Sequence, residues 1–221
     1  MWQKLEKINY DKRLEEILNK LTYKPSLLLH SCCGPCSSYV INYLKDYFNI
    51  TILYYNPNIE PYFEYEKRKA EQIRLIKELN LPNVSIRDID YENDLYKLAV
   101  IGLENEKEGG SRCHICYELR LRKTAEEASV NKYEYFGTTL SVSPYKNAQL
   151  LNLIGEKLSE EYKVKWLYSD FKKKDGYKKS IELSKEYNLY RQDYCGCLFS
   201  KSSEQENDYE WEKSNVFNKY I

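Results

Sequence analysis

Two patterns of apolar positions alternate along the chain. Short runs rich in leucine, isoleucine and aromatic residues have the composition of buried strands. They predict strands at 26–30, 50–55, 84–89, 133–139 and 164–168. Between these runs, apolar residues recur at helical spacing and are separated by charged residues. The longer stretches predict helices at 3–22, from Ser37 or Ser38 to about residue 47, and at 61–79, 92–101, 113–130, 147–161 and 175–188.

The regular alternation of strands and helices determines the expected fold class. Strands that alternate with helices build a parallel sheet through right-handed crossovers, with helices on both faces. We therefore expect an α/β protein with a Rossmann-like parallel sheet. Residues 1–25 are expected to form an N-terminal helical extension, residues 26–200 a metal-binding catalytic α/β domain, and residues 201–221 a polar C-terminal tail.

Composition and charge narrow the class of protein. The chain carries 34 basic and 34 acidic residues, so no bulk positive charge marks it as a polyanion-binding protein. It shows no signal-peptide pattern, and no apolar run reaches the roughly 18–20 residues of a membrane helix. We expect a soluble, cytoplasmic protein with no membrane partner. In that reducing compartment, its seven cysteines suit metal or redox chemistry better than a disulfide framework.

Three of the cysteines directly follow the first predicted strand. Behind the apolar run Leu27–Leu29 the sequence continues as His30-Ser31-Cys32-Cys33-Gly34-Pro35-Cys36. Glycine and proline mark this segment as a turn, and open α/β sheets bind their ligands at the carboxyl ends of the strands. We therefore place the main site here. His30 is expected either to hydrogen-bond to a metal ligand or to be an ordinary hydrogen-bonded histidine at the end of the strand.

A second pair, Cys113-His114-Ile115-Cys116, stands at the start of a predicted helix, where the first backbone amides favour thiolate over thiol. Together with the first loop it supplies five thiols from two segments. Four thiolates suit either a closed structural zinc site or a [4Fe–4S] cluster, and a redox dithiol is the third reading. The surplus thiol and the adjacent Cys32-Cys33 pair favour iron–sulfur or dinuclear metal over zinc.

A third group, Cys195-Gly196-Cys197, allows three interpretations. It can close a strained, readily reduced disulfide, contribute two further metal ligands, or be a pair of buried structural thiols.

Polar residues at the other strand ends are candidates for ligand contacts. They are Asn56 and Asn58 in an asparagine–proline turn, Thr138 and Thr139 at the end of the fourth strand, Arg112 beside the second cysteine pair, and Lys172 in a lysine-rich loop. Arginine and lysine suit phosphate recognition. An ordinary turn and a solvated basic face remain the alternatives for the asparagines and for the basic residues.

Taken jointly and in order, several motifs resemble those of the QueH-type epoxyqueuosine reductases. They are His30-x-Cys32-Cys33-x-Pro35-Cys36, Tyr55-Asn56-Pro57-Asn58-Ile59-x-Pro61, Glu64-Tyr65-x-x-Arg68, Arg112-Cys113-x-x-Cys116-Tyr117-x-x-Arg120-Leu121, Thr138-Thr139-Leu140-x-x-Ser143-Pro144, Asp170-Phe171-Lys172-Lys173-x-x-Gly176 and Tyr190-Arg191-Gln192-x-Tyr194-Cys195-Gly196-Cys197. They extend from about residue 27 to about residue 200 and cover nearly the whole chain.

The resemblance implies a reaction and a fold. Members of this family reduce the epoxide of epoxyqueuosine, carried at the wobble position of tRNA, to the cyclopentene of queuosine. This is the last step of tRNA queuosine biosynthesis, and the family performs it without cobalamin. The fold is similar to the adenine-nucleotide α-hydrolase-like fold. An external electron donor is a further expected partner, because the reaction consumes two electrons.

The resemblance also implies cofactors and ligands. By position, Cys32, Cys33, Cys113 and Cys116 hold a [4Fe–4S] cluster. A second, mononuclear iron beside it would use Cys36, where some members of the family carry aspartate. We assign catalytic roles to Cys36, Cys195 and Cys197, the last two relaying electrons or shielding the site. Substrate contacts are assigned to Asn56, Asn58, Arg112, Thr138, Thr139 and Lys172.

Two other functions remain to be weighed. An ATP-dependent tRNA-thiolating enzyme shares the fold class, but it needs a glycine-rich loop after the first strand, where this chain has Cys32-Cys33-Gly34-Pro35-Cys36. A zinc-stabilised nucleic-acid-binding module is the non-enzymatic alternative, and the neutral charge disfavours it.

Overall fold

The computed structural model describes residues 8–200 of the chain. Five strands alternate with helices along this part. The strands are β1 (Ser26–His30), β2 (Asn49–Leu53), β3 (Val84–Arg87), β4 (Tyr135–Thr138) and β5 (Lys165–Trp166). The helices are α1 (Tyr10–Leu18), α2 (Gly34–Leu44), α3 (Tyr62–Leu79), α4 (Asn93–Ala99), α5 (Ser111–Val130), α6 (Ala148–Tyr162) and α7 (Gly176–Glu186), with short 3-10 turns η1 (Leu140–Val142) and η2 (Leu198–Ser200).

The strands form one sheet in the order β3-β2-β1-β4-β5, and every neighbouring pair is parallel. The predicted α/β class with a Rossmann-like parallel sheet is therefore confirmed. β1 is the central strand, and Leu27, Leu28 and Leu29 are fully buried. The chain leaves β1 toward β2 on one side and returns to β4 on the other. The carboxyl end of β1 therefore lies at the point where the strand order reverses, which is where such sheets bind ligands.

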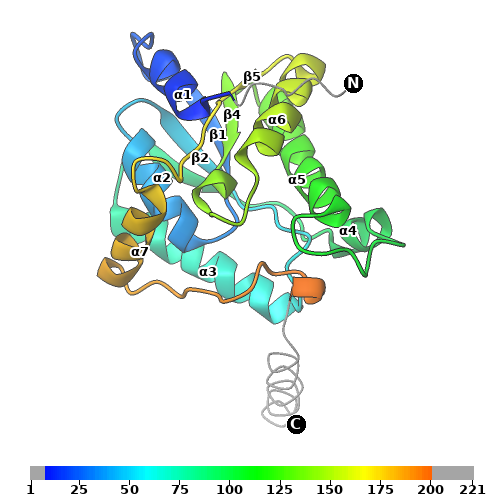
Figure 1. The fold of residues 1–221 in the computed structure, drawn as a ribbon. Helices are drawn as coiled ribbons and strands as arrows, with labels where there is room; N and C mark the ends of the chain where they lie inside the picture. The colour runs from blue at the N-terminus through cyan, green and yellow to red at the C-terminus, as the bar shows by residue number, and fades with distance from the viewer. Residues whose placement is uncertain (1–7, 201–221) are drawn as a thin grey trace.

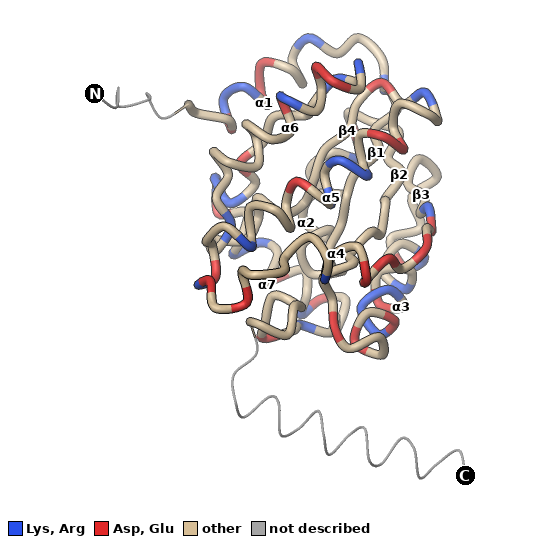
Figure 2. Tube along the Cα trace, turned by 90° about the vertical axis from the view of Figure 1, so that its right-hand side faces the viewer, with Lys and Arg blue, Asp and Glu red and all other residues tan. Residues whose placement is uncertain are grey.

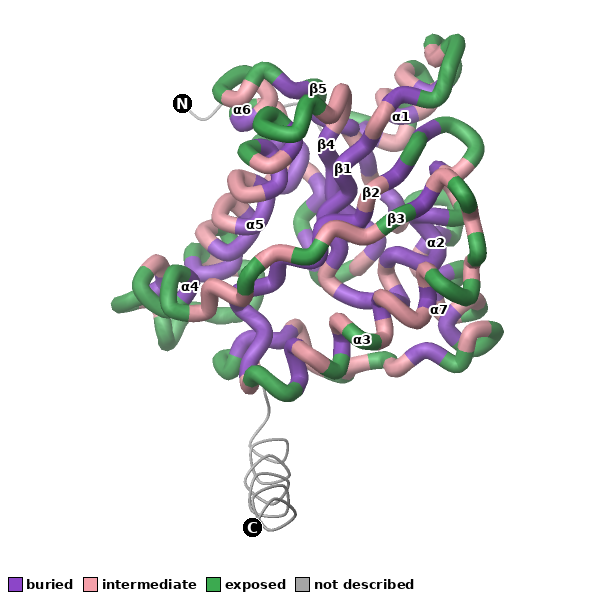
Figure 3. Tube along the Cα trace, turned by 180° about the vertical axis from the view of Figure 1, so that it is seen from behind, coloured by how far each residue is buried: buried purple, intermediate pink, exposed green. Residues whose placement is uncertain are grey.

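Alternating side chains of the strands bury two separate layers. Leu27, Leu29 and Ile52 pack with residues of α1 and α2 in one core. Leu28 and Phe136 pack with residues of α5 and α6 in the other. The two helical layers lie on opposite sides of the sheet (Figure 1), and the central strands are buried between them (Figure 3). This period-two alternation is what a sheet covered on both faces requires.

The start of α2 differs from the prediction in a way that changes the site. The helix begins at Gly34, three residues before the expected cap, and Cys33 is its N-cap residue. Pro35 fits this first turn because it has no N–H to leave unpaired there. The Ser37 hydroxyl caps nothing and instead donates to Gln72 Oε1 at 2.7 Å. Cys36 is therefore a helical residue rather than part of a loop.

At the two ends of the chain, the predicted elements lie partly or wholly outside the described residues. The predicted N-terminal helix corresponds to α1 over Tyr10–Leu18, with Asn9 as its cap, and its first residues lie outside the described range. The predicted polar tail at 201–221 also lies outside that range. Between residues 8 and 200, no helix has the length and apolar character needed to cross a membrane. Basic and acidic residues are interspersed over this part of the surface (Figure 2).

The packing of α6 on the edge strand β5 gives the first prediction. A Cβ atom at Gly155 would lie 2.2 Å from ring atoms of the buried Trp166, whose indole N–H donates to Asn152 Oδ1 at 2.9 Å. Gly155→Ala should therefore displace the indole and destabilise the fold by about 1–3 kcal/mol, measured by urea unfolding. Leu153→Ala on the exposed face of the same helix is the control and should change stability little. Equal stability of both variants would contradict this packing.

Candidate metal centre

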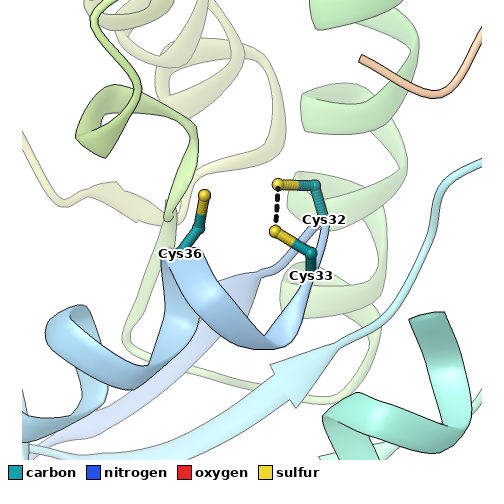
Figure 4. Close-up of side chains that lie close together, drawn as sticks. All are labelled: Cys32, Cys33 and Cys36. Carbon is teal, nitrogen blue, oxygen red and sulfur yellow. Dashed lines mark hydrogen bonds between the residues drawn. The ribbon is translucent and has the colours of Figure 1, made fainter. Parts of the chain in front are cut away.

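The cysteine segment after β1 brings three sulfurs together. The Sγ atoms of Cys32, Cys33 and Cys36 all lie within 4.8 Å of one another, and the Cys32 and Cys33 sulfurs are 3.6 Å apart. Figure 4 shows the three side chains around the turn from β1 into α2. Because α2 begins at Gly34, the first helical turn brings Cys36 back beside the adjacent pair. Among the described residues this is the one group of three or more potential metal-ligating side chains this close together.

Hydrogen bonds from neighbouring elements hold this turn in place. The hydroxyls of Ser31 and Ser37 both donate to Gln72 Oε1 on α3, at 2.8 and 2.7 Å. The side-chain amide of Asn56 donates to the carbonyl of Ser31 at 2.8 Å. All four side chains are buried. The turn is therefore fixed from two sides before any ligand binds.

Proton sharing within the group makes the three thiols unequal. Hydrogen bonding to Cys33 raises the pKa of Cys32 to about 12, and hydrogen bonds from Cys32 and Cys36 hold the pKa of Cys33 well below its usual value. Hydrogen bonding to Cys32 and Cys33 and burial raise the pKa of Cys36. Cys33 is therefore the thiol of the three that loses its proton most readily. A metal ion would displace the shared protons, since thiolate is the ligating form.

The second cysteine pair lies on α5, across from this turn. Cys113 packs in the same apolar core as Cys32, and the backbone amide of Gly109 donates to its sulfur at 3.2 Å. Cys116 packs instead with Tyr96 and Cys197, and burial raises its pKa to about 12. The predicted four-cysteine set is thus distributed over facing elements, with Cys113 and Cys116 outside the close group of three.

The third cysteine group is held against α3. Gly196 has a φ of 122°, and a Cβ there would lie 2.9 Å from Ile59, so only glycine fits between the two cysteines. Its carbonyl accepts from the amide of Glu60 at 2.8 Å. Cys195 and Cys197 are free thiols, as are the other five cysteines. A disulfide between Cys195 and Cys197 stays a prediction.

A cleft of about 270 Å³ opens between these groups, near the lower end of the size range of small-molecule sites. Its lining includes Cys32, Cys36, Cys195, Arg120, Lys146, Glu108, Tyr145 and Arg191. The Lys146 ammonium contacts the Cys195 sulfur at 3.1 Å and pairs with the Glu108 carboxylate at 3.0 Å. Burial opposes a charge at Lys146, but the nearby Cys195 thiol and other acidic groups raise its pKa overall, so the cleft contains a fixed cation.

His30 is a strand-end residue rather than a visible partner of a metal ligand. Its Nε2 lies 3.0 Å from the carbonyl of Tyr55, which can only accept, so this nitrogen carries the proton. Its Nδ1 then accepts from the hydroxyl of Thr138 at 3.0 Å. Burial, reinforced by Arg120, lowers the pKa of His30 to about 3 and keeps the ring neutral. The Thr138 hydroxyl, at the end of β4, is thus occupied by its hydrogen bond to His30.

The other residues predicted to bind substrate are mostly buried. Asn58 and Thr139 are at most 1% exposed, and each has a side-chain oxygen without a hydrogen-bond partner. Arg112 donates to the carbonyls of Leu103 and Glu104. Lys172 is partly exposed and pairs with Asp170 at 2.9 Å. None of these, nor Asn56 or Thr138, is among the residues that line the cleft.

Sequence reasoning missed the polar residues that complete the site. Gln72, Lys146 and Glu108 lie on segments with no cysteine, and Lys146 reaches Cys195 across 49 positions. The one sequence signal for Lys146 is its place two residues after the recognised Ser143-Pro144 pair. Arg120 and Arg112 are buried, whereas Arg122 is the solvated arginine that pairs with Glu118.

The donor set fits a thiolate-bound metal centre. Thiolates suit zinc, copper(I) and iron–sulfur clusters, and here thiols from the first and third cysteine segments line one cleft, while Cys113 packs in the same apolar core as Cys32. The fully buried guanidinium of Arg120 has an Nη2 without a hydrogen-bond partner. A buried guanidinium with an unpaired donor is stabilised by an anionic group beside it.

Comparison with known proteins agrees with this site. Residues 27–203 match the family described as "Epoxyqueuosine reductase QueH". A protein of that name from Streptococcus pyogenes is 40% identical over 88% of this chain and 79% of its own length. Those from Staphylococcus epidermidis and Thermotoga maritima are 43% and 35% identical, over 89% and 79% of this chain and 86% and 90% of theirs. The chain therefore belongs to the QueH family of epoxyqueuosine reductases.

Proposed function

We propose that this protein reduces epoxyqueuosine in tRNA to queuosine, the last step in the synthesis of that modified nucleoside. The family match over residues 27–203 carries this proposal, and the cysteine-lined cleft supports it. In the reaction two C–O bonds break, a C=C bond forms, and the epoxide oxygen leaves as water. Two electrons and two protons enter, the electrons from an external donor. The reduced thiols that this chemistry needs are consistent with a cytoplasmic protein.

The proposed cofactor is a [4Fe–4S] cluster held by Cys32, Cys33, Cys113 and Cys116, with Cys36 binding a second iron. When bound, this centre would supply electrons and polarise the epoxide oxygen. The convergence of Cys32, Cys33 and Cys36 within 4.8 Å supports the presence of a metal there. Cys32 and Cys36 face the cleft, while Cys33 is not among its lining residues. Cys36 and Cys195 are therefore the cleft-lining cysteines beyond the proposed cluster ligands.

We assign proposed roles in the reaction to residues in and around the cleft. Lys146, held by Glu108 and Cys195, keeps a proton at Nζ inside the cleft and can stabilise the oxygen as it leaves. Cys195, which lines the cleft, and the buried Cys197 are proposed to relay electrons or to shield the site. Burial favours an indirect role for Asn56, Asn58, Arg112, Thr138 and Thr139. Asn56 and Thr138 bond to residues at the end of β1, and Arg112 bonds to the carbonyls of Leu103 and Glu104. Lys172 remains the proposed phosphate contact.

The activity gives the second prediction. Anaerobically reconstituted protein, incubated with a strong reductant and epoxyqueuosine-containing tRNA, should form queuosine detectable by mass spectrometry of the nucleosides. Removing the metal with a chelator under oxidation should abolish the product, because the thiols alone lack a Lewis acid. Protein prepared anaerobically that holds one tight zinc and no iron, and yields no queuosine, would sink the proposal and favour a zinc-stabilised module.

Cys36 gives the third prediction. Cys36→Ala should retain the optical and EPR signals of the cluster, bind less iron per chain and lose epoxide reduction, since Cys36 is the proposed ligand of the second iron rather than of the cluster. Ser38→Ala, two residues further along the same helix and bonded only to the carbonyl of Pro35, is the control. Loss of the whole cluster in Cys36→Ala would instead make Cys36 one of the four cluster ligands.

Tyr145 gives the fourth prediction. It lines the cleft, yet its side chain is 76% exposed, which suits stacking on an unpaired base of the anticodon loop. Tyr145→Ala should weaken tRNA binding by about 1–2 kcal/mol, roughly ten-fold, whereas Tyr145→Phe should keep the stacking. Tyr47→Ala, at a partly exposed tyrosine that precedes the amino end of β2, is the control. Filter binding with unmodified tRNA measures the effect, and an unchanged affinity in Tyr145→Ala contradicts it.

A further inference from the structure

A buried arginine lies at the centre of the three cysteine segments. Arg120 is on α5, one helical turn after Cys116, and is 2% exposed. Its Nε donates to the carbonyl of Cys116 at 3.1 Å, and its Nη2 has no hydrogen-bond partner. It also lines the cleft together with Cys32 and Cys195. The guanidinium therefore bonds to the backbone of the second cysteine segment and lines the same cleft as cysteines of the other two segments.

Two other buried cations are neutralised by carboxylates, whereas Arg112 bonds to two backbone carbonyls instead. Arg68 bonds to Glu64 at 2.6 Å, and Lys146 pairs with Glu108 at 3.0 Å. Among the ion pairs of residues 8–200, Arg120 is in none. A buried charge without a counter-ion is strongly destabilising, so a fold that buries this guanidinium needs an anion beside it.

The thiols are the groups that can supply this anion. Burial works to lower the pKa of Arg120, but Cys116, Cys195 and Cys32 outweigh it and raise the pKa overall. A metal centre ligated by thiolates carries net negative charge, which a reduction makes more negative. A fixed positive charge in a poorly hydrated site stabilises the reduced form more than the oxidised form.

We propose that Arg120 is the built-in counter-charge of the thiolate-ligated metal centre and that it raises the reduction potential of that centre. This inference rests on the metal centre of the proposed function. It assigns to Arg120 a tuning role rather than contact with tRNA phosphates, because a guanidinium that is 2% exposed at the floor of the cleft is remote from the solvent-exposed RNA backbone.

The test compares Arg120→Gln, Arg120→Lys and Arg122→Gln. Arg122 lies two residues further along the same helix, pairs with Glu118 and Glu161 at the surface, and serves as the matched control. Each protein is reconstituted anaerobically, its iron and sulfide are counted, and its midpoint potential is measured by EPR-monitored titration without substrate. Arg120→Gln should titrate at a more negative potential than the wild type. Arg120→Lys should stay near the wild-type value, and Arg122→Gln should equal it.

An iron centre in Arg120→Gln with the wild-type potential overturns the inference, as does an equal shift in Arg120→Lys, which keeps the charge. If Arg120→Gln does not fold, the folding and the midpoint potential of Arg120→Lys decide between the outcomes. Recovered folding with a wild-type potential supports the counter-charge, whereas failure of both variants shows that the guanidinium serves packing alone and overturns it. A wild-type iron centre without epoxyqueuosine reduction defeats the proposed function but leaves this inference standing. A wild type that reduces epoxyqueuosine, together with an Arg120→Gln variant whose midpoint potential is unchanged, supports the proposed function and overturns this inference.

Discussion

The neutral, fully buried imidazole of His30 joins the strand ends on which the site is built. One ring nitrogen bonds to the carbonyl of Tyr55 beyond β2, and the other bonds to the hydroxyl of Thr138 at the end of β4. A charged ring would leave one nitrogen donating where it now accepts, so burial and neutrality are required together. Because the cysteine turn begins at the next residue, the position of its sulfurs follows from how these strand ends are tied.

Charge burial distinguishes this cleft from an ordinary apolar pocket. Arg68, Arg112 and Arg120 are each at most 2% exposed, and the Lys146 side chain is 8% exposed. Arg68 also donates to the carbonyl of Cys195 and lies over the ring of Tyr194, so the buried Glu64–Arg68 pair anchors the third cysteine segment. An i,i+4 pair that would contribute a few tenths of a kcal/mol on a surface is here a buried pair that is costly to break.

The sequence was sufficient for the sheet and for the cysteine-bearing elements, because strand composition and helical periodicity are local signals. It was insufficient where long-range packing decides. The start of α2 at Gly34 depends on how Gln72 of α3 receives Ser31 and Ser37, which spacing cannot show. In the same way, Arg120 and Arg122 look alike in sequence, yet one is buried among thiols and the other is solvated, because two positions along a helix face in different directions.

Topology explains why three distant cysteine segments can serve one cleft. The first follows the central strand, and the second begins the helix that leads into the neighbouring strand β4. The third comes from a segment that crosses α3 after the last described helix, where Gly196 bonds to Glu60. The first is fixed by the sheet, while the third is fixed by a few hydrogen bonds and one buried ion pair. Cys195 is therefore positioned by polar contacts, from Arg68 to its carbonyl and from Lys146 to its sulfur, whereas Cys197 packs in a buried cluster with Tyr96 and Cys116.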